Sequence, residues 1–266
     1  DLLEWQLYNA ALVGMGQSGT CYLYNNPLAS HGKIERREWY EVPCCPSNLT
    51  RTWETLQNYI LNIIDDKICV EQFISSVHNL ENNIEVHIES SLPYQGEVKI
   101  TLKHCPPEKK LRIRRPSWAT NFTILRNGNH YHTETTLHGE PGKPDTSGSV
   151  LLIEEWAEQE TILFCFDLPV RFVHAHPKVK GHQGKVTLTR GPIVYCLESI
   201  DNPDMDLFKV VVEPDPVTER PLPDPLGQGV ALEAKSITGK TLIFIPYHLW
   251  ANRGESQMTV WVKEKE

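Results

Sequence analysis

The sequence lacks any apolar run long enough to cross a membrane. Apolar stretches such as residues 150–153 and 243–245 fall far short of the roughly 18 residues that a spanning helix needs. An excess of positive charge is also missing, because 26 lysines and arginines face 34 aspartates and glutamates, for a net charge of −8. The sequence therefore predicts no membrane segment and no nucleic acid partner.

Cysteine is too sparse for a disulfide scaffold. Seven cysteines in 266 residues leave at least one thiol unpaired, and the chain is far longer than the small secreted domains that depend on disulfides. No charged and apolar leader is present, and the chain begins at Asp1 without a methionine. We therefore expect a reducing, cytoplasmic setting and a chain that is cut from something longer.

The composition is otherwise that of a folded globular protein. Hydrophobic residues make up 40% and charged residues 23%, which supplies enough apolar side chains for real cores. The length of 266 residues exceeds the usual range of about 100 to 200 residues per domain. We expect two folded units together with a fragment of a third.

Helical periodicity is confined to the early part of the chain. Apolar residues recur every three or four positions over residues 3–15, before a glycine-rich stretch, which predicts a helix with one buried stripe. The short aromatic stretch 21–28 predicts a strand that runs into a turn. Helical spacing returns over about residues 49–64, with Ser47 or Asn48 as the expected N-cap.

Later in the chain the apolar period changes from about 3.6 to 2 residues. Alternation over residues 84–88 and 98–102 predicts half-buried strands, and further strand-like runs continue to the end. Asn127 and Gly128 between two such runs predict a tight hairpin, because both central residues of that turn need a positive φ. Residues 140–149 are a loop by composition. Many short strands at this spacing predict a mainly β fold with sandwiches.

Two adjacent cysteines, Cys44 and Cys45, carry the pattern with the most unusual chemistry. Pro43 and Pro46 flank them, which predicts a stiff loop from which both thiols bind one metal ion, attack a carbon or form a vicinal disulfide. The opposing interpretation is two small buried side chains, since free cysteines commonly occur that way. A zinc site needs about four ligands, and no nearby residue stands at a recognised ligand spacing. The residues alone leave these alternatives open.

Four aromatic residues lie near the cysteines in the sequence: Tyr22, Tyr24, Trp39 and Tyr40. Core packing is the default interpretation of such aromatics. A platform on which a sugar ring stacks is the sharper alternative, and the sequence leaves both open.

Five blocks of sequence form a larger pattern. They are YLYNNPL at residues 22–28, WYEVPCCPSN at 39–48, RIRRPSWA at 112–119, RGPIVYCLE at 190–198 and IPYHLWANRG at 245–254. Together these blocks resemble glycoside hydrolase family 127, the non-reducing-end β-L-arabinofuranosidase type. The resemblance extends over nearly the whole chain, and the combination is far more specific than any single block.

The resemblance implies a mainly β chain with a helical start. Residues 1–64 would be the end of a catalytic (α/α)6 barrel, made of its C-terminal helices. Two antiparallel β-sandwich domains would follow, over residues 65–168 and 169–266.

The resemblance also implies a reaction and a site. Family members are retaining hydrolases of terminal furanosides, so the expected partner is a carbohydrate substrate, with L-arabinofuranosyl as the expected sugar. Zinc would be the cofactor. Cys44 would be the nucleophile and a zinc ligand, Cys45 a second zinc ligand, and Tyr24 a residue that contacts the substrate.

This chain departs from the family pattern at its start. In family members the remaining zinc ligands, a glutamate and a third cysteine, and the acid/base glutamate lie upstream, so no glutamate here receives those roles. We therefore expect the isolated chain to bind zinc weakly and to be inactive. The alternative is a non-catalytic β-sandwich protein that binds glycans or holds subunits together, and self-association into a homo-oligomer stays open.

Overall fold

The structure is a computed structural model of the chain. It describes residues 1–131, 135–136, 150–154, 159–214 and 216–265, so the predicted loop over 140–149 lies outside the described residues. The described residues are mainly β-strands with a few helical segments, which confirms the predicted mainly β class. The chain divides into two compact units. The first unit contains Asp1 and Thr52–Pro169, and the second contains Leu2–Arg51 and Val170–Glu266.

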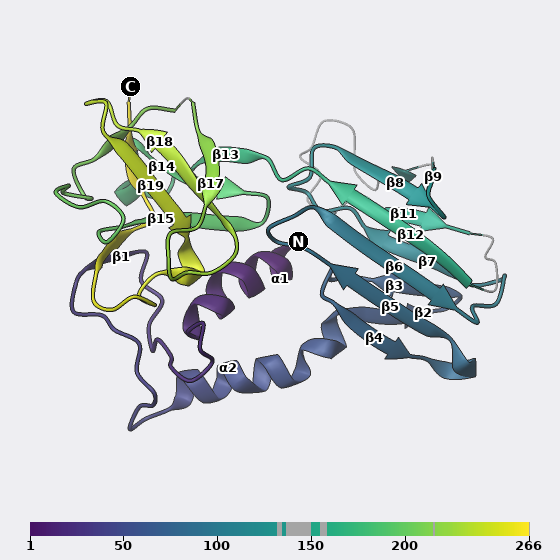
Figure 1. Cartoon of the computed structure of the whole chain (residues 1–266). Coiled ribbons are helices and arrows are strands. Elements are labelled where there is room, and N and C mark those ends of the chain that lie inside the picture. Colours follow the sequence, from purple (N-terminus) through teal and green to yellow (C-terminus); the bar gives the residue numbers. More distant parts are fainter. Residues whose placement is uncertain (132–134, 137–149, 155–158, 215, 266) are drawn as a thin grey trace. The chain divides into compact units, whose positions relative to one another are not determined.

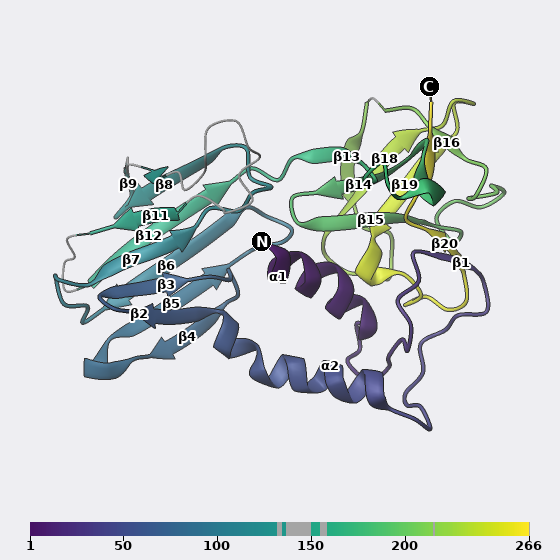
Figure 2. The same ribbon diagram turned by 180° about the vertical axis from the view of Figure 1, so that it is seen from behind.

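The first unit is a sandwich of two sheets, whose layers are seen from opposite sides in Figures 1 and 2. One sheet has the order β10-β11-β7-β3-β2, with bounds Thr135–Thr136, Val150–Ile153, Lys110–Arg114, Lys67–Val70 and Leu61–Ile64. The other has the order β4-β5-β6-β12-β8-β9, with bounds Ser76–Asn79, Glu85–Ser90, Glu97–Lys103, Gln159–Phe166, Phe122–Arg126 and Asn129–His130. The short 3-10 turn η4 (Glu81–Asn83) joins β4 to β5.

The two sheets of this unit share one apolar core. Val98, Ile100 and Leu102 of β6 are at most 1% exposed, so the alternation in the sequence marks the inward face as predicted. They belong to the same buried cluster as Ile68 of β3 and Leu111 of β7 in the facing sheet. The predicted hairpin is also confirmed, because the turn between β8 and β9 has φ values of 49° and 81° at its two central residues.

One pairing in the first unit differs from the antiparallel prediction. Strands β3 and β7 pair in parallel. The chain between them builds β4, β5 and β6 of the facing sheet before it returns, and a parallel neighbour requires such a long crossover. The sandwich is therefore mixed rather than purely antiparallel.

The second unit contains one curled ten-stranded sheet rather than two separate sheets (Figure 1). Its main path is β16-β21-β14-β15-β19-β18-β17, with bounds Val211–Val212, Val262–Glu264, Lys185–Arg190, Ile193–Glu198, Thr241–Pro246, Val230–Lys235 and Thr218–Pro221. Off this path, β13 (Val170–His174) pairs with β14, and β20 (Gln257–Thr259) pairs with β15 and β1. The purely antiparallel prediction is wrong here too, because β16 and β21 pair in parallel after a long connection.

Both faces of this sheet are buried. Along β19, Leu242 and Phe244 belong to one apolar cluster, whereas Ile243 and Ile245 belong to another. Because side chains alternate between the faces of a strand, the two clusters lie on opposite sides of the sheet. Val13 from the N-terminal segment joins the second cluster.

The N-terminal segment is an integral part of this second unit. The predicted helix over residues 3–15 is confirmed as three consecutive helical pieces, α1 (Leu2–Trp5), the π-helical η1 (Gln6–Ala11) and the 3-10 turn η2 (Leu12–Gly14). Figures 1 and 2 show these turns beside β15. Asn9 fixes them there, because its Nδ2 donates to Pro192 O at 2.8 Å and its Oδ1 accepts from Val194 N at 2.8 Å.

The predicted strand over residues 21–28 is wrong. Tyr22 makes only isolated bridges, with Met15 and Arg37, and the strand of this region is β1 (Ala29–His31), which pairs with β20. Pro27 has no amide hydrogen to donate to a ladder, so regular pairing begins after it.

The second predicted helix is misplaced at both ends. Helix α2 covers Cys44–Thr55 and continues as the 3-10 turn η3 (Leu56–Tyr59), whereas Leu61–Ile64 is strand β2. A short apolar run fits a helix or a strand equally well, and pairing with β3 decides in favour of the strand. None of the helices in the described ranges is long and apolar enough to span a membrane.

Candidate functional site

Cys44 and Cys45 lie in the first turn of α2. The sequence placed them on a loop ahead of the helix, with Ser47 or Asn48 as N-cap, and both predictions are wrong. Asn48 Nδ2 and Ser47 Oγ lie inside the helix and donate to the Cys44 carbonyl at 2.8 and 3.3 Å. The helix tolerates Pro46 at this point because the amide groups of a first turn have no partner within the helix.

The two thiols lie side by side at the surface of the second unit. Their Sγ atoms are 3.8 Å apart, and both residues are exposed and free. This exposure contradicts the interpretation of the pair as two buried, inert side chains. A disulfide needs a sulfur–sulfur distance of about 2.05 Å, so the two groups are separate thiols in this structure.

Tyr24 contacts the first of the two thiols. Its Oη lies 3.1 Å from Cys44 Sγ, which is hydrogen-bond distance for a hydroxyl and a sulfur. The structure thus brings together Tyr24, Cys44 and Cys45, the three residues that the sequence singled out. Their roles in binding metal or substrate stay predictions.

Tyr40 holds Tyr24 in place. The Tyr24 amide donates to Tyr40 Oη at 3.1 Å, and Tyr40 Oη donates to the Tyr22 carbonyl at 3.0 Å. The rings of Tyr24 and Tyr40 also pack together, with centroids 5.2 Å apart. The sequence considered Tyr40 only as one of four aromatics for core packing or sugar stacking. Its hydrogen bond to Tyr24 was missed, because a contact across sixteen positions leaves no periodic signal.

Trp39 is the aromatic residue of this region with the most accessible surface. It is 53% exposed, and its ring meets the ring of Tyr22 edge to face with centroids 5.9 Å apart. The four aromatics therefore divide into a packed pair, Tyr24 and Tyr40, and an edge-to-face pair in which Trp39 stays largely exposed.

The hydrogen bond to Tyr24 makes the two thiols unequal. It lowers the pKa of Cys44, because a donated hydrogen bond favours the thiolate. Desolvation, followed by the neighbouring sulfur of Cys44, raises the pKa of Cys45. The same contact raises the pKa of Tyr24 to about 12, so the phenol keeps its proton at neutral pH. Cys44 is therefore the thiol that ionises first.

The spacing of the two sulfurs fits a shared zinc ion. Two sulfurs at about 2.3 Å from one tetrahedral zinc lie about 3.8 Å apart, and the observed separation is 3.8 Å. The pair supplies two of about four donors that zinc takes. In the part of the chain that the structure describes, no three His, Cys, Asp or Glu side chains gather into a metal site. The pair fits zinc as an incomplete ligand set.

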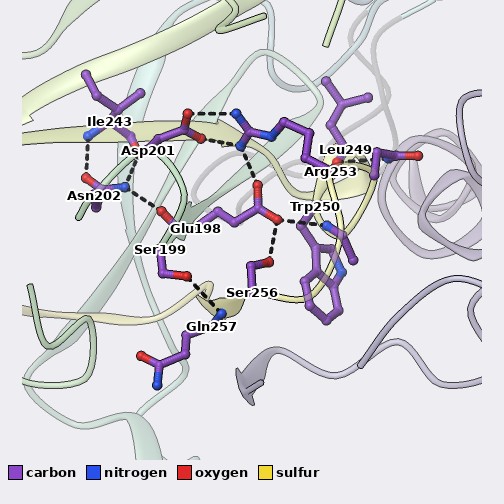
Figure 3. Close-up of polar contacts among 12 residues, drawn as sticks. Glu198, Ser199, Asp201, Asn202, Ile243, Leu249, Trp250, Arg253, Ser256 and Gln257 are labelled. Carbon is purple, nitrogen blue, oxygen red and sulfur yellow. Dashed lines mark hydrogen bonds and ion pairs between the residues drawn. The ribbon is translucent and has the colours of Figure 1, made fainter. Parts of the chain in front are cut away.

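A second polar cluster lies inside the curled sheet, and Figure 3 shows its contacts. Glu198 is fully buried, and its carboxylate accepts hydrogen bonds from Ala251 N at 2.9 Å and Ser256 Oγ at 2.6 Å. The same carboxylate pairs with the guanidinium of Arg253. Asp201 pairs with the same guanidinium through both of its oxygens, with Oδ1 2.8 Å from Nη1 and Oδ2 at the Nη2 that also contacts Glu198. We call these four side chains and the Ala251 amide the Glu198–Arg253 cluster.

This cluster joins two of the sequence blocks. Glu198 ends the block at residues 190–198, and Arg253 lies in the block at residues 245–254. Asn202 adds a further link, because its side-chain amide bonds the backbone of Glu198 and of Ile243 (Figure 3). The partners of these groups are backbone and neighbouring side chains, so the geometry assigns them to holding the fold.

Three family models match successive parts of the chain. The catalytic domain of GH127 β-L-arabinofuranosidase matches residues 1–58, and the GH127 middle domain matches residues 67–168. The C-terminal domain of glycoside hydrolase family 127 matches residues 170–263.

Individual relatives agree with these matches. A non-reducing end β-L-arabinofuranosidase of Bifidobacterium longum subsp. longum is 27% identical, over 98% of this chain and 44% of the relative. A GH127 β-L-arabinofuranosidase structure from Geobacillus stearothermophilus T6 superimposes with a TM-score of 0.82 at 28% identity, over 99% of this chain and 46% of that one. A solved GH127 β-arabinofuranosidase gives 0.84 at 25%, over 99% and 45%. The chain spans less than half the length of each relative.

Proposed function

This chain belongs to glycoside hydrolase family 127, and from that premise we propose that the protein hydrolyses terminal β-L-arabinofuranosides with retention, using Cys44 as nucleophile. The names of the matched relatives support the reaction and the sugar. The observation that carries the proposal is the 3.1 Å contact between Tyr24 Oη and Cys44 Sγ, beside a second exposed thiol. A nucleophile needs an accessible, ionisable atom with a partner that favours its charged form.

We further propose that residues 1–64 end a catalytic (α/α)6 barrel and that Cys44 and Cys45 both ligate zinc. The 3.8 Å separation of the two sulfurs supports a shared ion. When bound, zinc would hold coordinating thiols deprotonated at neutral pH. The proposal takes the remaining ligands, a glutamate and a third cysteine, from an upstream part of the barrel.

In the proposed reaction, Cys44 and Tyr24 have different roles. Cys44 Sγ attacks the anomeric carbon, so that a sulfur–carbon bond forms while the bond to the aglycone oxygen breaks. Tyr24 keeps its proton and directs it at the same sulfur, which orients the thiolate for attack. The leaving oxygen takes a proton from an upstream glutamate. Water then attacks the same carbon, gives a proton back to that glutamate and displaces the sulfur as a thiolate. Each displacement inverts the anomeric carbon, so the two together retain its configuration.

We propose the exposed Trp39 ring for stacking against the sugar or its aglycone. Its 53% exposure next to the thiol-bearing segment supports this role, since aromatic faces bind the apolar face of a sugar ring. Tyr24, which is closer to the thiol, would contact the sugar at the reacting carbon.

For the chain on its own, we propose weak zinc binding and no turnover. The incomplete ligand set among the described residues supports this. We also propose a reducing, cytoplasmic setting, which the seven unpaired thiols support.

The test of the nucleophile is Cys44→Ser in the full-length protein, meaning this chain together with the proposed upstream part of the barrel. The substrate is nitrophenyl β-L-arabinofuranoside. We expect the rate to fall by at least about a thousandfold, because a serine hydroxyl is a far weaker nucleophile than a thiolate. Cys21→Ser is the matched control, since Cys21 is another free thiol of the same unit that does not contact Tyr24 in the hydrogen bonds of the structure. Retained hydrolysis in Cys44→Ser would remove this residue from the mechanism.

Metal analysis separates the enzyme from a non-catalytic alternative. We expect near-stoichiometric zinc in the full-length protein and its loss in Cys45→Ala. A full-length protein without zinc and without hydrolysis would instead favour a sandwich protein that binds glycans or holds subunits together.

A further inference from the structure

We propose that Arg36 is a positioning residue, which couples the curled C-terminal sheet to Tyr24 beside Cys44. The inference rests on the proposed function, because it assigns a supporting framework to the same site. All residues involved belong to one compact unit, which unites residues 2–51 with residues 170–266. The C-terminal sheet would then be part of the catalytic framework rather than an appended domain.

The guanidinium of Arg36 donates hydrogen bonds to three backbone carbonyls, which come from two segments far apart in the sequence. Its Nη1 donates to Val13 O at 2.9 Å, and its Nη2 donates to Trp250 O at 2.9 Å and His248 O at 3.3 Å. These carbonyls lie in or next to the short turns η2 and η6 (Tyr247–Leu249), where no helical partner remains for them. Burial lowers the pKa of Arg36 to about 10, so the side chain stays charged at neutral pH.

One peptide group connects Arg36 to the Glu198–Arg253 cluster. The Trp250 carbonyl accepts from Arg36, and the amide of the same peptide, which belongs to Ala251, donates to Glu198 Oε1 at 2.9 Å. This peptide lies between a cation at its oxygen and a carboxylate at its hydrogen, so each hydrogen bond strengthens the other. Figure 3 shows the Trp250 segment beside the buried carboxylate.

On the side of the thiols, Arg37, the residue next to Arg36 in the chain, connects to Tyr24 and Tyr40 through Tyr22. Arg37 and Tyr22 exchange two backbone hydrogen bonds, at 2.8 and 3.0 Å. The Tyr22 carbonyl also accepts from the hydroxyl of Tyr40, whose oxygen accepts the amide hydrogen of Tyr24. A path of hydrogen bonds and short covalent links therefore runs from the buried carboxylate to the phenol beside the thiol.

Close packing limits what can replace Arg36. A Cβ atom at Gly16 would lie 3.2 Å from Arg36 Cδ and 2.4 Å from Cys21 Sγ. The backbone at Gly16 therefore packs directly against the aliphatic part of the Arg36 side chain. Lysine carries a single ammonium group instead of a planar fork, and it cannot serve the carbonyls of both segments with the same geometry.

The test is ¹⁹F NMR of the full-length protein labelled with 3-fluorotyrosine, recorded without metal or substrate. The resonance of Tyr24 is assigned by its absence in Tyr24→Phe. Arg36→Met keeps much of the side-chain length and removes the fork. Arg37→Met is the matched control, because the Arg37 side chain is 63% exposed and its ion pair with Glu35 spans 3.9 Å.

We expect the Tyr24 resonance to shift or broaden in Arg36→Met and to stay in place in Arg37→Met. We also expect kcat to fall by about 10- to 100-fold in Arg36→Met with little change in KM, because a small misplacement of a reacting group acts mainly on the chemical step. An unmoved Tyr24 resonance in folded Arg36→Met overturns the inference. If that variant does not fold, Arg36→Lys is judged by the same criterion, with a smaller shift expected.

Failure of this inference is distinguishable from failure of the proposed function. The resonance does not depend on hydrolysis, so a shift in Arg36→Met upholds the coupling even if Cys44→Ser retains activity. Tyr40→Phe is an independent test of whether Tyr40 positions Tyr24. It removes the hydroxyl that accepts the Tyr24 amide hydrogen and retains the Arg36 side chain. A shift in Tyr40→Phe without one in either Arg36 variant would confine the positioning role to Tyr40 and overturn the role of Arg36.

Discussion

The Glu198–Arg253 cluster and the Cys44–Tyr24 pair both come from sequence blocks that carry the family resemblance, yet their surroundings are opposite. Glu198 is fully buried and has partners on both carboxylate oxygens. Cys44 is exposed, and its sulfur contacts Tyr24 and Cys45. A buried charge must be paired to be tolerated, whereas a reacting atom must stay accessible. Burial thus distinguishes a block that holds the fold from a block that can react.

The largest expected effect on stability is at Arg253. Arg253→Met leaves the carboxylates of Glu198 and Asp201 buried without their cation, so we expect a loss of about 3–5 kcal/mol of unfolding free energy. Chemical denaturation measures this. Arg220→Met, which removes a half-exposed arginine paired with Glu233, should change stability by less than about 1 kcal/mol. Similar losses in both variants would show that the buried cluster has no special structural role.

The next effect is a pH dependence from the same buried region. Burial, followed by the charge of Arg36, lowers the pKa of His248 from 6.5 to about 4. The unfolded chain therefore takes up this proton near pH 6.5 and the folded chain only near pH 4, so stability falls as the pH drops between these values. The loss is about 3 kcal/mol. We expect His248→Leu to flatten this part of the stability curve, and an unchanged slope in that variant would contradict this assignment.

A smaller effect is expected at Ser256. Ser256→Ala removes the hydroxyl that donates to Glu198 Oε1 at 2.6 Å in a buried site. The loss of one donor to a buried carboxylate costs about 1–3 kcal/mol. Thermal unfolding checks this against Ser18→Ala, an exposed serine of the same unit. Equal stability of the two variants would contradict the account of the cluster.

The smallest effect on stability, but a distinct chemical effect, is expected at Tyr24. Tyr24→Phe removes an exposed hydrogen bond, and we expect a change of less than about 0.5 kcal/mol. The pKa of Cys44 should rise, because the donor that favours its thiolate is lost. The pH dependence of Cys44 alkylation in metal-free protein measures this shift. An unchanged or lowered pKa would remove Tyr24 from the activation of the thiol.

Much of the fold follows from local patterns in the sequence. Alternation over β5 and β6 and the Asn127-Gly128 turn each have a direct physical cause, and the structure confirms them. The start of α2 and the strand identity of β2 were missed, because Pro46 in a first turn and a short apolar run are both ambiguous signals. The parallel pair of β3 and β7 depends on a long-range crossover that no local window records.

The candidate site divides in the same way. Cys44 and Cys45 stood out by residue type alone, and Tyr24 followed from the resemblance. Tyr40 and Arg36 were not assigned, because their contacts join segments sixteen and more than two hundred positions apart. The roles of Glu198 and Arg253 required the structure, since only burial shows that their charges pair with each other.

The most direct test of the central claim is to locate the sugar that is covalently bound during turnover. Full-length protein is mixed with an activated β-L-arabinofuranoside, quenched in acid, digested, and analysed by fragmentation mass spectrometry of the peptide that carries both cysteines. The account predicts a pentosyl group on the sulfur of Cys44. A pentosyl group on Cys45, or on a carboxylate elsewhere in the protein, would contradict it.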